Sequence, residues 1–491
     1  LTGDHMGKTA LASFREISAS PRPSGPREGI RAYVNAFAEE RGLEHLEDSV
    51  GNITIRRPAS TGYEKTACLM LQGHMDMIAA KVSTSYHDFE TEPLTLITDG
   101  DILKADGTTL GADDGVAVAY MLAILDDPSL KAPELECVFT VDEETGLEGA
   151  NAMDCSALRS KYMITLDSPA EGVFTVSCAG GKRYDITYTF QPVKRRGLVF
   201  SITLSGLKGG HSGEDVHRGR ASANVLMGEL LKRIDSSGSL CLSSFTGGSM
   251  DNAIPSYCTA EIQLTMDNIR TRHSMAGIER ELEEIAAEFK ERYRGTDPDL
   301  ELSVSIRPEV HDYMCSEEDT KKIIALINGL PSGIISMSDE IGGLVQSSSN
   351  LGIVDVYPGK AQIVAHMRSS EPAEMDAMSA QVEACAKAAG AAWNIPSEYP
   401  GWALQKESRF RDLATEVYRG MYGSEPELEI IHAGLECGIL KGKMPDLDII
   451  STGPNVWDLH SPDERLSLSS FERVYDYVVL LLSKMDDACG L

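Results

Sequence analysis

The sequence predicts an α/β fold: a discontinuous domain with a mostly parallel central sheet flanked by helices, interrupted by an inserted α+β domain. Three observations lead to this prediction. Helical and strand patterns alternate through the first third of the 491 residues. From about residue 182 the pattern changes to alternating strands and long helices, and after about residue 395 the α/β pattern returns. We therefore expect one domain in two parts, 8–180 and 395–491, around an insert at 181–394.

The first part of the α/β domain combines apolar residues at helical spacing with short continuous apolar runs. Helices are predicted at 9–18, 27–41 and 115–126. Buried strands are predicted at 67–73, 135–141 and 161–166. Asp113 or Asp114 is expected to cap the third helix, because a side-chain carboxylate can accept from the free N–H groups of a first turn.

The insert has a different pattern, in which apolar and polar residues alternate as they do in antiparallel strands. Its strands are predicted at 184–190, 198–204 and 362–368, and its helices at 220–234 and 275–290. The last part returns to helices at 409–421 and 469–484 and strands at 427–431 and 447–451.

Composition limits the partners of this chain. Its 45 Lys and Arg against 75 Asp and Glu give a formal charge of −30, which argues against a nucleic-acid backbone or an anionic membrane as partner. The acid excess has two interpretations, solubility or a cation site, and composition alone cannot choose between them. No run approaches 18 apolar residues and the start of the chain lacks a basic-plus-apolar signal pattern, so neither membrane spanning nor secretion is expected.

The ten cysteines form no CxxC or CxC pair, and several lie in apolar runs. That usage is typical of reduced, buried thiols in a cytoplasmic protein, and not of a disulfide framework or a thiolate zinc site.

Candidate functional side chains stand at or just beyond the ends of the apolar runs. They are His74 and Asp76, Asp142 to Glu144, Asp167, His460, and the Asp113–Asp114 pair that opens a helix. Ligands of open α/β sheets collect beyond the carboxyl ends of the strands. One such acid is usually a cap or a loop residue, but five groups at the same edge predict a site.

The residue types indicate divalent metals. His74 and Asp76 are two residues apart, and a metal-binding imidazole often hands its other N–H to a carboxylate, although this pattern alone is common. Glu143 and Glu144 are adjacent, so one can bind a metal while the other faces a substrate; the alternative is a solvated loop. Histidine and carboxylates without cysteine suit zinc, manganese or cobalt. The number of ligands favours two ions sharing a bridging carboxylate.

Together these motifs resemble a family, the dinuclear-zinc aminoacyl-histidine dipeptidases (Xaa-His dipeptidases, peptidase D) of the carboxypeptidase-G2/aminoacylase-like metallopeptidases. The similar segments run in order from about residue 9 over essentially the whole chain. They include Gly73-His74-Met75-Asp76, Gly111-Ala112-Asp113-Asp114-Gly115, Asp142-Glu143-Glu144, Leu166-Asp167-Ser168, Gly209-Gly210-His211-Ser212-Gly213, Asn252-Ala253-Ile254-Pro255, His432-Ala433-Gly434-Leu435-Glu436 and His460-Ser461-Pro462.

The resemblance implies a catalytic domain with two metal ions, most simply zinc. His74 and Asp167 would bind one ion, Glu144 and His460 the other, and Asp113 would bridge them. Asp76 would orient His74. Glu143 would be the general base that takes a proton from the metal-bridging water and passes it to the leaving amine.

The resemblance makes the insert a lid and homodimerisation domain. His211 would stabilise the developing oxyanion, or else only cap the following helix; His217 is a weaker candidate. Asn252 and Arg368 would hold a substrate carboxylate, although Arg368 equally fits a solvated strand edge. His432 and Glu436 would shape the pocket near the metals, where Glu436 would either neutralise a substrate amine or support other residues.

The chain departs from the family pattern at Asp114 and Pro169, where an amide and an acid are expected. The leading hypothesis is a cytoplasmic dipeptidase that hydrolyses small unblocked dipeptides, typically Xaa-His and carnosine-like ones. The alternatives are a metal-dependent N-acyl amino acid deacylase or other small amidohydrolase, and a non-catalytic metal-binding or peptide-binding relative. The intact Glu143 argues against the last.

Overall fold

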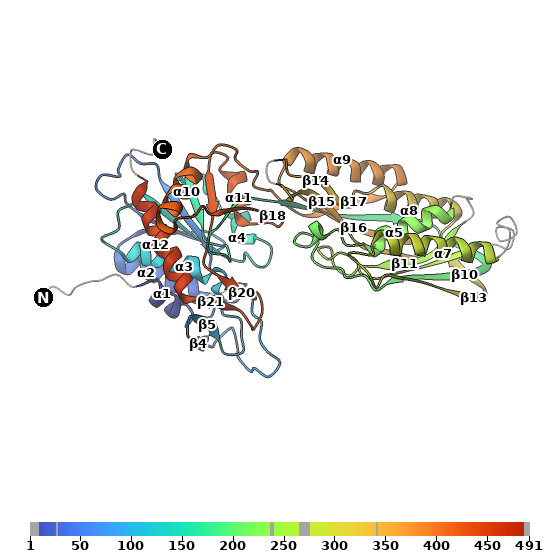
Figure 1. Cartoon of the computed structure of the whole chain (residues 1–491), viewed down its shortest axis with the longest axis horizontal. Coiled ribbons are helices and arrows are strands. Elements are labelled where there is room, and N and C mark those ends of the chain that lie inside the picture. Colours follow the sequence, from blue (N-terminus) through green and yellow to red (C-terminus); the bar gives the residue numbers. More distant parts are fainter. Residues whose placement is uncertain (1–8, 26–27, 236–239, 265–274, 340–341, 486–491) are drawn as a thin grey trace. The chain divides into compact units, whose positions relative to one another are not determined.

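The computed structural model describes residues 9–25, 28–235, 240–264, 275–339 and 342–485, so Lys8 of the predicted first domain lies outside them. The described chain divides into two compact units (Figure 1). Unit 1 extends to Ser177 and resumes at Leu404–Ile430 and from Leu435 onward. Unit 2 comprises Cys178–Ala403 and Ile431–Gly434.

The unit boundaries differ slightly from the expected 180/181 and 394/395. The second falls after Ala403 because β17 (Ala392–Tyr399) pairs with β9 (Gly180–Thr189) of unit 2, and Trp402 forms a bridge with Cys178. No periodic pattern distinguishes Ile431–Gly434, which belongs to unit 2 through tertiary contacts alone.

Unit 1 is built on an eight-stranded sheet of order β1-β2-β6-β3-β7-β19-β8-β18. Its strands are β1 (Glu44–Glu47), β2 (Ile53–Arg57), β3 (Leu69–His74), β6 (Leu135–Thr140), β7 (Tyr162–Thr165), β8 (Val173–Cys178), β18 (Glu427–Ile431) and β19 (Asp448–Ser451). The central strands β6, β3, β7 and β19 are parallel, whereas β1, β2 and β8 pair antiparallel. The α/β class is confirmed, but the sheet is mixed and only its centre is parallel.

Helices and a small second sheet complete unit 1. The helices are α1 (Ala10–Ile17), α2 (Glu28–Arg41), α3 (Ala112–Asp126), α4 (Glu148–Ala152), α10 (Arg409–Tyr422), α11 (Glu436–Lys443) and α12 (Leu468–Lys484). The four-stranded sheet has the order β20 (Val456–Trp457), β21 (Arg465–Ser467), β5 (Ile102–Ala105) and β4 (Leu96–Asp99).

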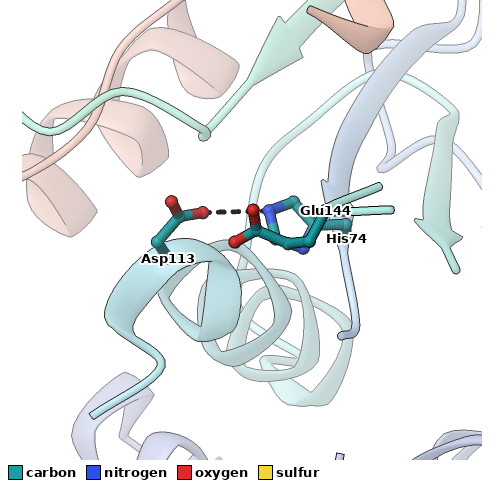
Figure 2. Close-up of side chains that lie close together, drawn as sticks. All are labelled: His74, Asp113 and Glu144. Carbon is teal, nitrogen blue, oxygen red and sulfur yellow. Dashed lines mark hydrogen bonds and ion pairs between the residues drawn. The ribbon is translucent and has the colours of Figure 1, made fainter. Parts of the chain in front are cut away.

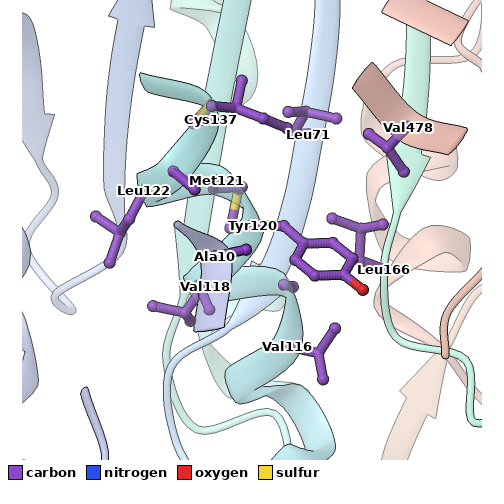
Figure 3. Packing of buried hydrophobic residues seen from close by; sticks show 14 of the residues in the cluster. Ala10, Leu71, Val116, Val118, Tyr120, Met121, Leu122, Cys137, Leu166 and Val478 are labelled. Carbon is purple, nitrogen blue, oxygen red and sulfur yellow. The ribbon is translucent and has the colours of Figure 1, made fainter. Parts of the chain in front are cut away.

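Helix α3 is the centre of the unit 1 core, and it is apolar on all sides because it is buried on all sides. Figure 3 shows Tyr120 and Met121 of α3 among Leu71 of β3, Ala10 of α1 and Val478 of α12. Asp113 and Asp114 have non-helical backbone angles, and Asp114 Oδ1 accepts from the N–H of Ala117 at 3.2 Å. The predicted cap is therefore Asp114.

Unit 2 is a nine-stranded sheet of order β13-β10-β12-β11-β15-β16-β9-β17, with β14 beside β15. Besides β9 and β17, its strands are β10 (Val193–Ser205), β11 (Cys241–Gly247), β12 (Cys258–Leu264), β13 (Glu301–Met314), β14 (Gly333–Met337), β15 (Val345–Tyr357) and β16 (Lys360–Ser369). Helices α5 (Ala223–Ile234), α7 (Met275–Arg292), α8 (Glu317–Gly329) and α9 (Pro372–Ala389) pack against it (Figure 1). The pairing is antiparallel, as the alternating pattern predicts.

Two further predictions from the sequence can be compared with the described residues. Their nine cysteines are all free thiols, and seven of these are buried. None of the described helices has the length and apolar character needed to cross a membrane.

Gly73 offers a test of how strand β3 packs on helix α3. A Cβ at this position would collide with the side chains of Ala117 and Asp114. We expect Gly73→Ala to destabilise the protein by about 1–3 kcal/mol, because an overpacked core must shift. The measurement is the melting temperature of the variant.

The matched control for this substitution is Gly420→Ala in α10, where an added Cβ meets no atom within 4 Å. Alanine is the better helix former by about 1 kcal/mol, so the control should keep or raise the melting temperature. Equal melting temperatures for the two variants would contradict the close packing of β3 on α3.

Candidate active site

The parallel strands of unit 1 end at one edge of the sheet, and the predicted ligands gather there. His74 is the last residue of β3, Glu143 and Glu144 follow β6, and Asp167 follows β7. β19 lies parallel to β7 and precedes the loop that reaches His460. The strand order therefore brings together residues that lie far apart in the sequence.

Asp113 lies between the two histidines. Its Oδ1 is 2.9 Å from His74 Nε2, and its Oδ2 is 3.1 Å from His460 Nε2. The same His460 nitrogen is 3.1 Å from Glu144 Oε1. Figure 2 shows His74, Asp113 and Glu144 pointing toward one another, and their ligand atoms lie within 4.8 Å of each other.

A second group shares His74 and adds Asp114 and Asp167, again with ligand atoms within 4.8 Å of one another. Asp114 is buried, and its Oδ2 accepts from the backbone N–H of His74 at 3.3 Å. Since Oδ1 caps helix α3, both oxygens of Asp114 already have donors. Asp167 is the carboxylate of this group that remains available to a cation.

Asp76 contacts both His74 and the turn that carries Glu143 and Glu144. Its backbone carbonyl is 3.0 Å from His74 Nδ1, and its carboxylate is 3.4 Å from the same nitrogen. The carboxylate also accepts from the backbone N–H groups of Glu143 and Glu144, at 3.2 and 3.4 Å. Asp76 therefore orients the histidine and also holds the turn that carries the two glutamates.

Unusual backbone conformations occur at the same edge. Among the described residues, the four non-glycine residues with positive φ lie in the loop of Glu143–Glu144 and in the loop of His460: Asp142, Leu147, Asp458 and His460. His460 itself has φ of 60°. Conformations of this kind cost energy and persist where the surrounding contacts impose them, which is common at functional sites.

The pKa values of this cluster reflect how closely its acids and histidines are packed. Burial raises the pKa of Asp167 to about 7, helped by the nearby Asp113, and burial also raises the pKa of Glu143 well above its usual value. Hydrogen bonds to Asp113 and Glu144 raise the pKa of His460 to about 10. In the absence of metal ions, protons bound to these groups offset the negative charge of the crowded carboxylates. Bound metal ions would supply positive charge in their place. Two imidazoles and several carboxylates, without thiolates, are the donors that zinc, manganese and cobalt accept.

Two residues that support the cluster have no signal in the sequence pattern. The buried carboxylate of Glu464 accepts from four consecutive backbone N–H groups: Leu110, Gly111 and Ala112 at 2.8 Å and Asp113 at 3.3 Å. The buried Arg22 donates to the carbonyls of Gly111 and Met75. Neither residue belongs to a periodic pattern or motif, and only the folded chain brings them to the site.

Glu436 lies in the same unit and is buried. Its Oε2 accepts from Gln72 Nε2 at 2.5 Å and Thr140 Oγ1 at 2.6 Å. Its Oε1 is buried without a hydrogen-bond partner within the described part of the chain. Burial raises the pKa of Glu436 to about 7, so its carboxylate is costly to keep charged without a cation nearby.

Unit 2 carries the other predicted residues. The Nδ1 atom of His211 accepts from the backbone N–H of Glu214 at 3.1 Å. Burial and the nearby Arg368 lower the pKa of His211, so the neutral ring carries its proton on Nε2. His211 is thus a hydrogen-bond donor. The neighbouring His217 is exposed. Asn252 contributes its backbone carbonyl, which accepts from Ser212 N at 2.8 Å.

Arg368 is buried in unit 2, not solvated at a strand edge. It donates to the hydroxyl of Tyr399 at 3.2 Å, and its Nε has no partner among the described residues. Among the described residues, no carboxylate forms an ion pair with its guanidinium. His432 donates or accepts at Ser348 Oγ, 2.7 Å away, and burial beside Arg368 lowers the pKa of His432 to about 4. A buried guanidinium among neutral histidines is suited to an incoming anion.

Comparisons with known proteins agree with this chemistry. The model of peptidase family M20/M25/M40 matches residues 70–484. The chain is 33% identical over 475 residues to the cytosol non-specific dipeptidase of Escherichia coli (strain K12), covering 96% of each chain.

Solved structures show the same relationship. The crystal structure of aminoacylhistidine dipeptidase from Vibrio alginolyticus matches with a TM-score of 0.89 and 31% identity over 96% of each chain. A second match is an aminopeptidase of Bacillus cereus, with a TM-score of 0.55 and 16% identity over 97% of this chain and 98% of its own. At that identity the match shows a shared fold alone. The resemblance found in the sequence is confirmed: this chain belongs to peptidase family M20/M25/M40 and is a hydrolase that acts on peptide bonds.

Proposed function

We propose that this protein is a dipeptidase that uses two divalent metal ions, zinc first and manganese or cobalt as alternatives. The observation that carries the proposal is Asp113, whose two oxygens face two different histidines. The half-buried Glu143 is near enough to interact electrostatically with His74 and Asp113. When bound, the two ions would lower the pKa of a water molecule and polarise the carbonyl of the scissile bond.

We assign His74 and Asp167 to one ion, Glu144 and His460 to the other, and Asp113 to both. Both oxygens of Asp114 accept hydrogen bonds from backbone N–H groups. This supports Asp167, rather than Asp114, as the ligand that accompanies His74. Asp76 supports the assignment of Glu144 as well, since it holds the backbone of the turn from which this side chain projects.

Glu143 is the proposed general base. Burial and the surrounding acids raise its pKa, which makes its carboxylate a better proton acceptor near neutral pH. It would take a proton from the attacking water and deliver it to the leaving amine. His211, a neutral Nε2 donor, would hydrogen-bond the oxygen on which negative charge develops.

The substrate proposed is a small unblocked dipeptide, of which Xaa-His is the first to test. The buried Arg368, without a carboxylate partner in the described chain, suits a free C-terminal carboxylate; Asn252 and His432 would line the same site. The unpartnered Oε1 of Glu436 suits a free amino group, which an N-acyl amino acid lacks. This difference favours a dipeptidase over a deacylase.

We also propose a cytoplasmic location and a homodimer formed through unit 2. The name of the Escherichia coli relative and the free thiols support the location. The dimer rests on the resemblance.

The first prediction from this proposed function concerns Glu143, the proposed general base. Glu143→Gln should lower kcat by about 10²- to 10⁴-fold while leaving the metal content unchanged, because the amide cannot accept the proton. Initial rates on Xaa-His dipeptides and elemental analysis of the same sample provide the measurement. Glu148→Gln, at an exposed position in the adjacent helix α4, is the control and should keep full activity. A fully active Glu143→Gln variant would rule out the assigned role.

The second prediction concerns the metals. Removal by a chelator should abolish hydrolysis and lower the melting temperature, because ions that bind only the folded protein stabilise it. Adding back zinc, manganese or cobalt should restore both, with two ions per chain at saturation. Saturation at one ion, or activity that survives complete removal, would contradict the dinuclear proposal.

The third prediction concerns Arg368. Arg368→Met should raise KM for dipeptides with a free C-terminal carboxylate by about 10- to 100-fold, the worth of one charged hydrogen-bonding pair of 1.5–3 kcal/mol. Hydrolysis of the corresponding dipeptide amides, which lack that charge, should change little and serves as the internal control. An equal loss on both substrates would show that Arg368 does not recognise the carboxylate. N-acetyl amino acids in the same assay test the deacylase alternative.

A further inference from the structure

The loop that carries His211 connects β10 to α5, and its two ends meet at one side chain. The N–H of Lys208 donates to Asp297 Oδ1 at 2.9 Å, and the N–H of Ala221 donates to Asp297 Oδ2 at 2.9 Å. Asp297 is 1% exposed. One oxygen of this buried carboxylate therefore accepts from an N–H group just before residues 209–220, and the other accepts from an N–H group just after these twelve residues.

Asp297 is itself held firmly in the turn that follows α7. Its N–H donates to the carbonyl of Tyr293 at 2.8 Å, and its carbonyl accepts from the N–H of Leu300 at 3.1 Å. Gly206 has φ of 74° and lies so close to the turn that a Cβ would collide with the carbonyl of Asp299. The turn and the start of the loop thus pack without space between their backbones.

Within the loop, the closed backbone determines how the His211 ring is presented. The N–H of His211 donates to Asp215 Oδ2 at 2.9 Å, and the N–H of Asp215 donates back to the His211 carbonyl at 3.0 Å. The N–H of Glu214 occupies Nδ1 of the ring. On the other side, the N–H of Ile254 donates to the Gly210 carbonyl at 2.8 Å.

We infer that Asp297 is a positioning residue for His211: by closing both ends of the loop it fixes the place from which the Nε2–H donor acts. The inference rests on the proposed role of His211 in hydrolysis. Position 297 needs an acceptor for each of two N–H groups, and the two oxygens of a carboxylate provide them. An asparagine would keep one acceptor and set its NH₂ group against the second backbone N–H, which would open one end of the loop.

The test is a double-mutant cycle on the full-length, metal-loaded protein with Asp297→Asn, His211→Ala and the double variant. We expect Asp297→Asn to lower kcat/KM by about 10- to 100-fold, because a misplacement of about 1 Å in a reacting geometry can cost that much. In the His211→Ala background the same substitution should cause little further loss. Metal content should be unchanged, and amide hydrogen exchange should accelerate in segment 208–221.

The matched control is Asp299→Asn, which changes an exposed carboxylate in the same turn and should leave the kinetics unaltered. If Asp297→Asn fails to fold, Asp297→Ser, a smaller side chain that retains one acceptor, takes its place in the cycle.

Three outcomes would overturn the inference. Losses that multiply in the double variant would show that Asp297 acts independently of His211. Full activity of the Asp297 variant, with His211→Ala impaired, would remove Asp297 while leaving the proposed function intact. Full activity of His211→Ala would remove the role of His211 itself, and the positioning role with it.

Discussion

The active-site edge of unit 1 depends on one buried carboxylate that we assign to neither ion. Glu464 accepts from the backbone N–H groups of Leu110 to Asp113, and so it shapes the turn that presents Asp113, the proposed bridging ligand. It also stands four residues after His460, so one side chain joins two ligand-bearing segments that are about 350 residues apart in the sequence. A buried acid is expensive unless its oxygens are satisfied, and here backbone donors satisfy both. The spacing of the proposed ligands therefore depends on the hydrogen bonds of Glu464. Arg22 holds the same turn by donating to the carbonyl of Gly111.

The electrostatics of the site follow from concentrating acids where the sheet ends. Most of the formal charge of −30 belongs to acids outside this edge, and it requires no cation to explain it. The few acids beside His74 differ because burial removes the water that would stabilise them. Burial opposes the ionisation of Asp113 too, but the two neighbouring histidines outweigh it and lower the pKa of that carboxyl. Each oxygen of Asp113 faces a different imidazole nitrogen, and this geometry is our reason for proposing two cations there.

The sequence predicted the parts of the fold and site that leave a local pattern. The central strands are mostly apolar runs, and the sequence predicts His74, Glu144 and Asp167 as site residues because each lies at or shortly after the end of such a run. Edge strands such as β1, with its half-exposed alternation, lack this signal. Glu464, Arg22 and Asp297 were not found, because their partners are backbone groups distant in the sequence and no spacing marks them. The sequence around Arg368 fits both a solvated strand edge and a binding residue, and only tertiary packing shows that it is buried.

Both units use a buried carboxylate to hold the backbone of a loop. A loop that carries a functional side chain leaves backbone N–H groups without helix or sheet partners, and a buried carboxylate accepts from them: Glu464 below Asp113, and Asp297 below His211. This separates the buried acids into two classes by their donors. Those with backbone N–H donors on both oxygens hold the structure, and Asp114 belongs with them. Glu436, with one oxygen unpartnered in the described chain, keeps an acceptor for a substrate. Counting backbone donors on each buried carboxylate, rather than counting acids, therefore distinguishes the acids that hold the fold of this enzyme from those we propose for its chemistry.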